Sequence, residues 1–328
     1  MALWAIRLLF RVAGQSVLPD APAPDGIGTP MSSTPYNWEL LTEHAAFSPR
    51  DTSEGIVFRD KMWLSNAYHH GNVLVRDLWN STDGTNWSQV SDDTPYGGYS
   101  EMVVFEDRLF AVKESVWVSD DGEDWTKILD KTPFGMTGYG ELIVYKGKMW
   151  QIGPGPEVWS STDGQHWDCA TDAAACGDRR SSATMLFDDK LWRIAGNREQ
   201  ENSPVEKGYP NFTTYNDVWC STDGAEWTQV LEHAPWAPRM WCRGRAYAGA
   251  LWLIGGFDNA NHTNLGDVWY THDGITWTEF ISDPVFAPRH EPTLYTAHDS
   301  LWVVAGNTWP VVNDVWRLTL PEGWDSLG

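Results

Sequence analysis

The sequence predicts an all-β fold, a six-bladed β-propeller with four short strands in each blade. The first supporting observation is a repeated motif, such as DVWCSTDGAEWTQV at 217–230, that places two tryptophans eight residues apart around an Asp-Gly pair. The second is a short apolar hairpin pattern, such as VFRDKMW at 57–63, which precedes each motif. Repeats of roughly 40 to 60 residues with four strands each are typical of propeller blades.

The motif sets the number of blades and predicts how the ring closes. Its first tryptophan occurs six times, at Trp79, Trp117, Trp159, Trp219, Trp269 and Trp316. Its second occurs at Trp87, Trp125, Trp167, Trp227 and Trp277. For the sixth blade, YNWELLTEHAAFSPR at 36–50 parallels EWTQVLEHAPWAPR at 226–239, so the strand around Trp38 is expected to pair with Val315–Leu318. Joining the two chain ends in one blade removes exposed edge strands. The propeller is therefore assigned to residues 36–320, followed by a tail at 321–328.

Within the motif, the Asp-Gly pair predicts a tight turn between two strands, and the tryptophans are interpreted as wedges between blades. The aspartates interpreted as turn formers are Asp83, Asp121, Asp163, Asp223 and Asp273.

Two propeller families share parts of this pattern. LWLIGG at 251–256 and LWVVAGN at 301–307, each followed by a loop and DVW, resemble the kelch repeats of galactose-oxidase-type propellers. The STDGxxW segments are similar to the Asp-box of sialidase propellers, with one residue fewer between Asp and Gly. The resemblance covers residues 36–320 and implies that these turns are architectural and lie away from an active site. Neither the copper ligands of galactose oxidase nor the sialidase catalytic residues have a matching motif here.

Composition limits the partners and the compartment. The formal net charge of −22 argues against nucleic acid and anionic membrane surfaces as partners, because phosphate binding requires clustered Lys and Arg.

The N-terminal segment MALWAIRLLFRVAG at 1–14 is too short to span a bilayer. Residues 1–35 form an N-terminal extension and linker, which could target the chain, mediate oligomerisation by docking, or precede a true start at Met31. The absence of a clear signal peptide favours the cytoplasm and leaves localisation open. Cys169 and Cys176 could form a disulfide or remain free thiols.

Candidate site residues come from the loops that surround one mouth of the central channel. Four positions before the aromatic residue of each first strand stand Glu54, Glu101, Glu141, Ala183, Arg243 and Glu291. Two positions earlier stand Thr52, Tyr99, Tyr139, Ser181, Trp241 and Arg289. Arg180, Arg239 and His290 lie next to these positions, and Trp309 lies in a loop between strands 2 and 3. The loop at 196–217 is long and predicts a lid or binding element, whereas blades 2 and 3 have short loops and leave a low side.

Clustered carboxyls raise one another's pKa, so that a general acid can stand beside an ionised base. The catalytic candidates are Glu54, Glu101, Glu141 and Glu291. Arginine can clamp an acidic group, and aromatic faces suit sugar rings. The substrate-binding candidates are Arg243, Arg239, Arg289, Arg180, Tyr99, Tyr139, Trp241, His290 and Trp309.

These residues favour a carbohydrate-active hydrolase, lyase or epimerase whose sugar could be acidic. Three alternatives stay open: a non-catalytic kelch-type module that binds a glycan or a protein, a subunit of a larger assembly, and Glu–Arg pairs that only line the channel. No cofactor is required. Ca²⁺ among the glutamate oxygens is a further alternative, which Arg243 at the same level opposes.

Overall fold

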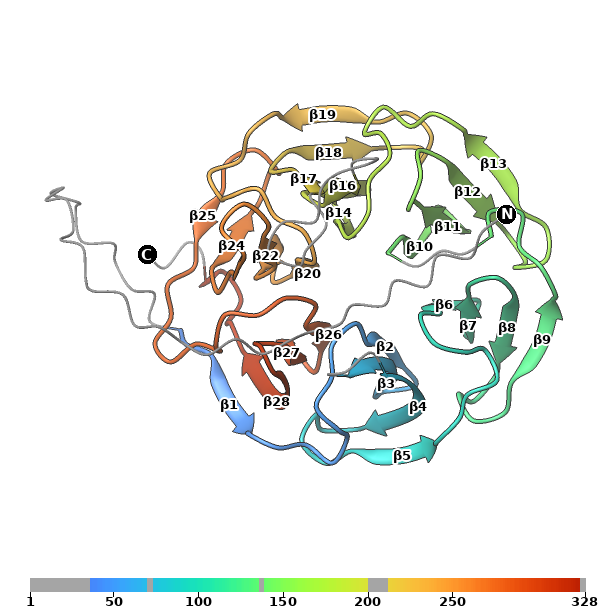
Figure 1. The fold of residues 1–328 in the computed structure, drawn as a ribbon, viewed down its shortest axis with the longest axis horizontal. Coiled ribbons are helices and arrows are strands. Elements are labelled where there is room, and N and C mark those ends of the chain that lie inside the picture. The colour runs from blue at the N-terminus through green and yellow to red at the C-terminus, as the bar shows by residue number, and fades with distance from the viewer. Residues whose placement is uncertain (1–35, 70–72, 136–138, 200–211, 325–328) are drawn as a thin grey trace, which may run out of the picture.

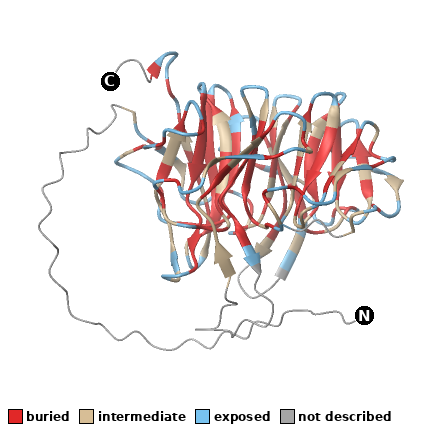
Figure 2. Ribbon diagram, turned by 90° about the horizontal axis from the view of Figure 1, so that it is seen from above, coloured by how far each residue is buried: buried red, intermediate tan, exposed pale blue. Residues whose placement is uncertain are grey.

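The structure is a computed structural model that describes residues 36–69, 73–135, 139–199 and 212–324. Six four-stranded antiparallel sheets stand around a central axis as the blades of a propeller (Figure 1). Buried residues run through the strands, and exposed residues concentrate in the connecting turns (Figure 2). The predicted fold is confirmed.

Each blade runs from an inner strand at the axis to an outer strand at the rim. Blade 1 contains β2 (Glu54–Phe58), β3 (Lys61–His69), β4 (Val73–Ser81) and β5 (Ser88–Ser91). Blade 2 contains β6 (Glu101–Phe105), β7 (Arg108–Val112), β8 (Val116–Ser119) and β9 (Thr126–Leu129). Blade 3 contains β10 (Glu141–Tyr145), β11 (Lys148–Ile152), β12 (Val158–Ser161) and β13 (Asp168–Thr171).

The remaining blades follow the same order. Blade 4 contains β14 (Ala183–Phe187), β15 (Lys190–Ile194), β18 (Val218–Ser221) and β19 (Thr228–Leu231). Blade 5 contains β20 (Arg243–Tyr247), β21 (Ala250–Ile254), β24 (Val268–Thr271) and β25 (Thr278–Glu279). Blade 6 contains β26 (Thr293–Ala297), β27 (Ser300–Asn307), β28 (Val311–Leu318) and β1 (Glu39–Thr42). Two small hairpins extend blades 4 and 5: β16 (Asn197–Glu199) with β17 (Phe212–Thr214), and β22 (Phe257–Asp258) with β23 (Thr263–Asn264).

Blade 6 contains strands from both ends of the chain. β1 pairs antiparallel with β28, with Leu40 opposite Trp316 (Figure 1). The Trp38 ring packs edge-to-face on the Phe286 ring, with 5.1 Å between the ring centroids. In blade 5 the rings of Trp277 and Trp236 pack in the same way, with centroids 4.4 Å apart.

The Asp-Gly turns repeat one set of contacts. In blade 1, Asp83 Oδ1 accepts hydrogen bonds from the backbone of Thr85 and Asn86 at 2.8 and 2.7 Å. Ser81 Oγ accepts from the Gly84 amide at 2.9 Å. The turns at 119–125, 161–167, 221–227 and 271–277 have the same bonds. The aspartates therefore act as turn formers.

Each turn glycine packs under an aromatic side chain of the preceding blade. A Cβ on Gly84, whose φ is +73°, would lie 2.3 Å from the Trp302 ring. Blade 6 lacks this turn, and the C-terminal segment supplies the contact instead. Trp324 lies 5.5 Å from Trp252 and donates Nε1 to Ala248 O at 3.1 Å. Residues 321–324 thus pack onto the propeller, with Trp324 buried.

A buried Arg–Asp–Trp unit anchors four blades. In blade 5, Arg239 donates to both carboxylate oxygens of Asp267 at 2.7 Å, and Asp267 also accepts from Trp269 Nε1. Arg239 Nη1 further donates to Gly255 O, at the start of the loop between strands 2 and 3. The equivalent units are Arg50–Asp77–Trp79, Arg179–Asp217–Trp219 and Arg289–Asp314–Trp316.

This unit corrects two site assignments. Arg239 and Arg289 were expected to bind substrate, but they are 0% and 1% exposed and their guanidinium groups are bound to carboxylates and carbonyls within their blades. They support the tall loops of blades 5 and 6 and are not ligand-binding groups.

We predict that Asp267→Ala lowers the free energy of unfolding by about 3–5 kcal/mol, because it leaves the Arg239 charge buried without its partner. The matched control is Asp130→Ala, which removes the exposed Lys127–Asp130 pair and should change stability by less than about 1 kcal/mol. Urea unfolding of both variants is the measurement. Equal losses for the two variants would show that the buried pair is not an anchor.

We further predict that Gly274→Ala destabilises the propeller more than Gly249→Ala. Both glycines have φ +75°, but a Cβ at Gly274 would lie 2.0 Å from Trp192, whereas nothing lies within 4 Å of one at Gly249. The shared left-handed conformation costs about 1–2 kcal/mol for alanine, and overpacking adds about 1–3 kcal/mol at Gly274 only. Thermal unfolding compares the two, and equal melting temperatures would contradict the packing argument.

Candidate functional site

Six residues with left-handed backbone form a ring at the channel mouth. Each stands two positions before an inner strand, with φ between 48° and 71°. We call this set the mouth ring: Thr52, Tyr99, Tyr139, Ser181, Trp241 and Glu291. Neighbouring blades are joined here by backbone hydrogen bonds, from Ser181 N to Tyr139 O, from Trp241 N to Ser181 O and from Glu291 N to Trp241 O. Left-handed non-glycine residues are costly, and they persist where surrounding contacts hold them.

The first residue of each inner strand forms a second ring, deeper in the channel. We call it the inner ring: Glu54, Glu101, Glu141, Ala183, Arg243 and Thr293. The strand register is the same in every blade. Glu54 pairs with Ser65, Arg243 with Ile254 and Thr293 with Val304, each at the far end of the hairpin from its turn.

The register corrects the predicted place of Glu291. Alignment of the strands on Tyr295 predicts that Glu291 lies in the inner ring. The hairpin turn of blade 6 is His298–Asp299, with φ of 49° and 53°, and it matches the turns of the other blades. Ala297 therefore takes the place of the usual aromatic residue, and Thr293 is the inner-ring residue. Glu291 belongs to the mouth ring, and Arg289, two residues earlier, belongs to a buried Arg–Asp unit.

The two rings line a cavity that is open to solvent, with an empty volume of about 520 Å³ that includes part of this solvent. All six mouth-ring residues line it, together with Glu54, Glu101, Glu141 and Arg243. A second cavity of about 350 Å³ lies farther along the inner strands, beside Arg245. Glu54, Glu141 and Arg243 line both cavities and so mark the boundary between them.

Glu101 is a buried carboxyl that favours its protonated form. It is 8% exposed, and neither oxygen has a well-formed hydrogen bond within the described chain. Burial and the nearby Glu141 and Glu54 raise the pKa of Glu101 well above 4.5, and the Gln151 amide lowers it only in part.

Glu141 and Arg243 form an ion pair beside Glu101. Glu141 Oε1 lies 3.4 Å from Arg243 Nη1, and the two side chains are 22% and 23% exposed. Burial raises the pKa of Glu141 to about 7, although Arg243 opposes the change. Burial also raises the pKa of Glu54, again opposed by Arg243. The inner ring thus holds carboxyls of different proton affinity around one guanidinium group.

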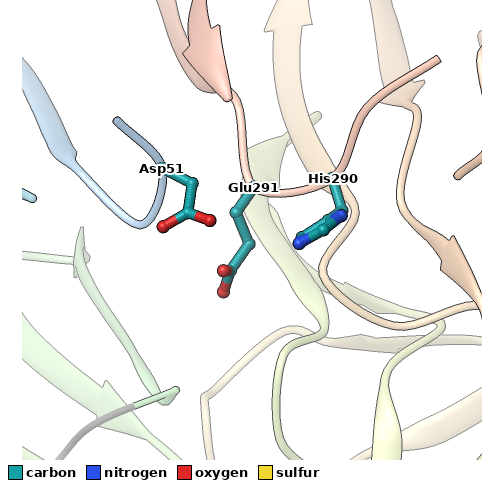
Figure 3. Close-up of side chains that lie close together, drawn as sticks. All are labelled: Asp51, His290 and Glu291. Carbon is teal, nitrogen blue, oxygen red and sulfur yellow. The ribbon is translucent and has the colours of Figure 1, made fainter. Parts of the chain in front are cut away.

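Asp51, His290 and Glu291 form a second cluster at the mouth (Figure 3). Thr52 Oγ1 lies 2.7 Å from Glu291 Oε2 and 3.0 Å from Asp51 Oδ1. Burial raises the pKa of Asp51, and burial together with the charge of Asp51 raises that of Glu291. Burial lowers the pKa of His290 to about 3. Asp51 is not among the site residues predicted from the sequence. Its only signal was position, since Asp51 and His290 each directly precede a mouth-ring residue.

Aromatic residues surround both clusters. The His290 ring contacts the rings of Trp241 and Trp309, with 5.1 Å between ring centroids in both pairs. Tyr99 and Tyr139 lie 6.1 Å apart on the side of blades 2 and 3. Arg180 is half-buried next to Ser181. The structure therefore brings together Tyr99, Tyr139, Trp241, Arg243 and the inner-ring glutamates as predicted lining residues, with His290 and Trp309 beside them.

Other expectations fall partly outside this site. The long loop of blade 4 begins and ends in the β16–β17 hairpin, and its residues 200–211 lie outside the described residues. The N-terminal extension at 1–35 also lies outside them. All four cysteines, including Cys169 and Cys176, are free thiols. None of the described segments includes a helix long and apolar enough to cross a bilayer.

Comparisons with known proteins agree on the fold. The family model of the DUF6242 beta propeller domain matches residues 32–325. Among solved structures, the one titled "Structure of YjhT" is similar, with a TM-score of 0.66 and 15% sequence identity over 85% of this chain and 97% of that chain. At that identity the likeness supports the fold alone. No curated protein sequence matches the chain.

We predict that Glu101→Gln stabilises the protein at neutral and higher pH. A raised pKa in the folded state means that the contribution of Glu101 is fully present below about pH 4.5 and is lost as the pH rises through the folded pKa. Glutamine does not ionise, so the variant should gain about 1 kcal/mol or more above pH 7 and little at pH 4. Urea unfolding across this range, with exposed Glu226→Gln as control, is the measurement. An equal pH dependence in variant and parent would contradict the raised pKa.

Proposed function

The chain belongs to the family of the DUF6242 beta propeller domain, and from the geometry of its site we propose that its function lies at the mouth of the propeller channel. The function is that of a carbohydrate-active enzyme that binds a small sugar in the 520 Å³ cavity and transfers protons to and from it. Hydrolase, lyase and epimerase reactions all need such proton transfer.

The observation that carries this proposal is the pairing of Glu101 with the Glu141–Arg243 ion pair in one cavity. Glu101 holds its proton because burial and neighbouring carboxyls oppose ionisation. Arg243 favours the ionised form of Glu141. Two carboxyls whose surroundings separate their proton affinities can serve as acid and base. Glu101 takes the role of general acid and Glu141 that of general base, with Glu54 tuning both through its charge.

The lining of the cavity also suits a sugar. Tyr99, Tyr139 and Trp241 offer ring faces, and the Arg243 guanidinium can donate to hydroxyl or carboxylate oxygens of the ligand. An acidic sugar would therefore be accepted as well as a neutral one.

A non-catalytic glycan-binding module is the second candidate. It is favoured by two large aromatic side chains that stay exposed at the rim, Tyr139 at 40% and Trp309 at 41%. Exposed aromatic residues at a cavity rim can bind a sugar without chemistry. In this case, Glu101 and Glu141 would contribute polarity and no proton transfer.

We predict that Glu101→Gln reduces turnover by about 10²–10⁴-fold on whichever sugar the parent converts, because the variant keeps the shape and loses the proton. The parent is first incubated with a panel of neutral and acidic sugars and glycosides, and NMR follows anomer exchange, epimerisation and bond cleavage. Glu226→Gln, in an exposed Asp-Gly turn, is the matched control and should keep full turnover.

The outcomes separate the candidates. Undiminished turnover by Glu101→Gln would overturn the catalytic assignment. Sugar binding by the parent without conversion of any panel member would favour the binding module. Binding that is lost in Trp241→Ala would place the ligand in the cavity in either case.

A further inference from the structure

Asp51, His290 and Glu291 converge at the channel mouth from two neighbouring blades (Figure 3). One ligand atom from each lies within 4.8 Å of the others, and all three residues are buried. It is the single such group of three or more His, Cys, Asp or Glu residues in the described part of the chain. We propose that these three side chains form a binding site for a divalent transition metal ion such as Zn²⁺.

The hydrogen bonds of His290 leave one ring nitrogen for the metal. Asn264 donates Nδ2 to Asn307 O at 2.8 Å, so its Oδ1 faces His290 Nδ1 at 2.6 Å. A carbonyl oxygen only accepts, so Nδ1 carries the hydrogen and Nε2 has a free lone pair. His290 is 3% exposed, and Nε2 makes no hydrogen bond within the described chain. It points toward Glu291 (Figure 3). Metal-binding histidines usually have this second hydrogen bond to a carbonyl or carboxylate.

The two carboxylates are also positioned by their neighbours, and they share one hydroxyl donor. Asn307 accepts from the Trp309 amide through Oδ1 and donates Nδ2 to Asp51 Oδ2 at 2.8 Å. Asp51 Oδ1 and Glu291 Oε2 both contact Thr52 Oγ1, whose hydroxyl has one hydrogen to give. One carboxylate is therefore short of a donor, and a cation between them would satisfy both.

The ligand set indicates the class of metal. Imidazole nitrogen with carboxylate oxygen suits Zn²⁺ and similar ions, whereas Ca²⁺ and Mg²⁺ prefer oxygen alone. With metal–ligand bonds of about 2.0–2.2 Å, tetrahedral ligands stand roughly 3.4 Å apart, so closure on the ion needs about 1 Å of side-chain movement. Three protein ligands leave an open position. Glu291, Thr52 and Trp241 line the cavity at the channel mouth, so the metal site borders this cavity.

The three proposed ligands are different residues from those of the inner ring. Arg243 acts on Asp51 and Glu291 as well as on Glu54 and Glu141, but its guanidinium group forms its ion pair with Glu141. Metal binding at the mouth and proton transfer at Glu101 can each fail without the other, because they use different residues.

We predict that the metal-free full-length chain binds one Zn²⁺ in equilibrium dialysis, and that Ca²⁺ and Mg²⁺ bind at least about 10-fold more weakly. Glu291→Gln and His290→Gln should each weaken Zn²⁺ binding by more than about 10-fold, and Asn264→Leu by about 10–100-fold through loss of ring orientation. Substitution with Co²⁺ gives a visible absorption band that reports the ligand set.

Two variants serve as controls, and circular dichroism verifies that every variant is folded. Exposed His272→Gln and inner-ring Glu101→Gln should bind Zn²⁺ as the parent does. The proposal is overturned if the parent binds no Zn²⁺, if Glu291→Gln binds as the parent does, or if Glu101→Gln abolishes binding. It is also overturned if Ca²⁺ binds more tightly than Zn²⁺.

Discussion

The buried pair between arginine and aspartate is the contact on which the tall side of the propeller depends. In blades 1, 4, 5 and 6 the arginine lies before the inner strand, and the aspartate lies within the third strand or directly before it. A carbonyl at the base of the intervening loop accepts from the same guanidinium group. Blades 2 and 3 have Ser115 and Glu157 in place of the aspartate, and their loops are short. In the described chain, the longer loops between strands 2 and 3 and the buried pair therefore occur in the same blades.

The repeated backbone of the blades allows the side chains at the channel mouth to differ from blade to blade. The mouth-ring positions share one backbone conformation, which aligns six side chains around the channel whatever their type. The chain can therefore exchange tyrosine for serine or glutamate there without changing the turn. Adjacent blades contribute single residues to a joint cluster, as blade 1 does with Asp51 and blade 6 with Glu291. Function in such a protein depends on the differences between repeats, and stability depends on their similarities.

The fold was predictable from the sequence because tryptophan spacing and Asp-Gly turns are local signals that recur in every blade. The inner-ring glutamates of blades 1 to 3 were predicted correctly, because each stands four residues before the aromatic residue that ends its inner strand. The same alignment was wrong in blade 6, where Ala297 replaces the aromatic residue and no local feature marks the strand register. The arginine pairs and the Asp51 cluster could not be predicted, because they join residues of different loops or blades whose contact appears only after folding.

The two ends of the chain meet in the blade that also presents His290 and Glu291. Trp38 packs on Phe286, four residues before His290, and Trp324 covers Trp252 in the neighbouring blade. Trp38 Nε1 has no hydrogen-bond partner in the described chain, whereas the second tryptophan of blade 5 donates to a turn carbonyl. β1 and residues 321–324 nevertheless pack onto blades 6 and 5, on either side of the loop that carries His290 and Glu291. Removal of either segment would therefore loosen the support of that loop from the outer part of the ring.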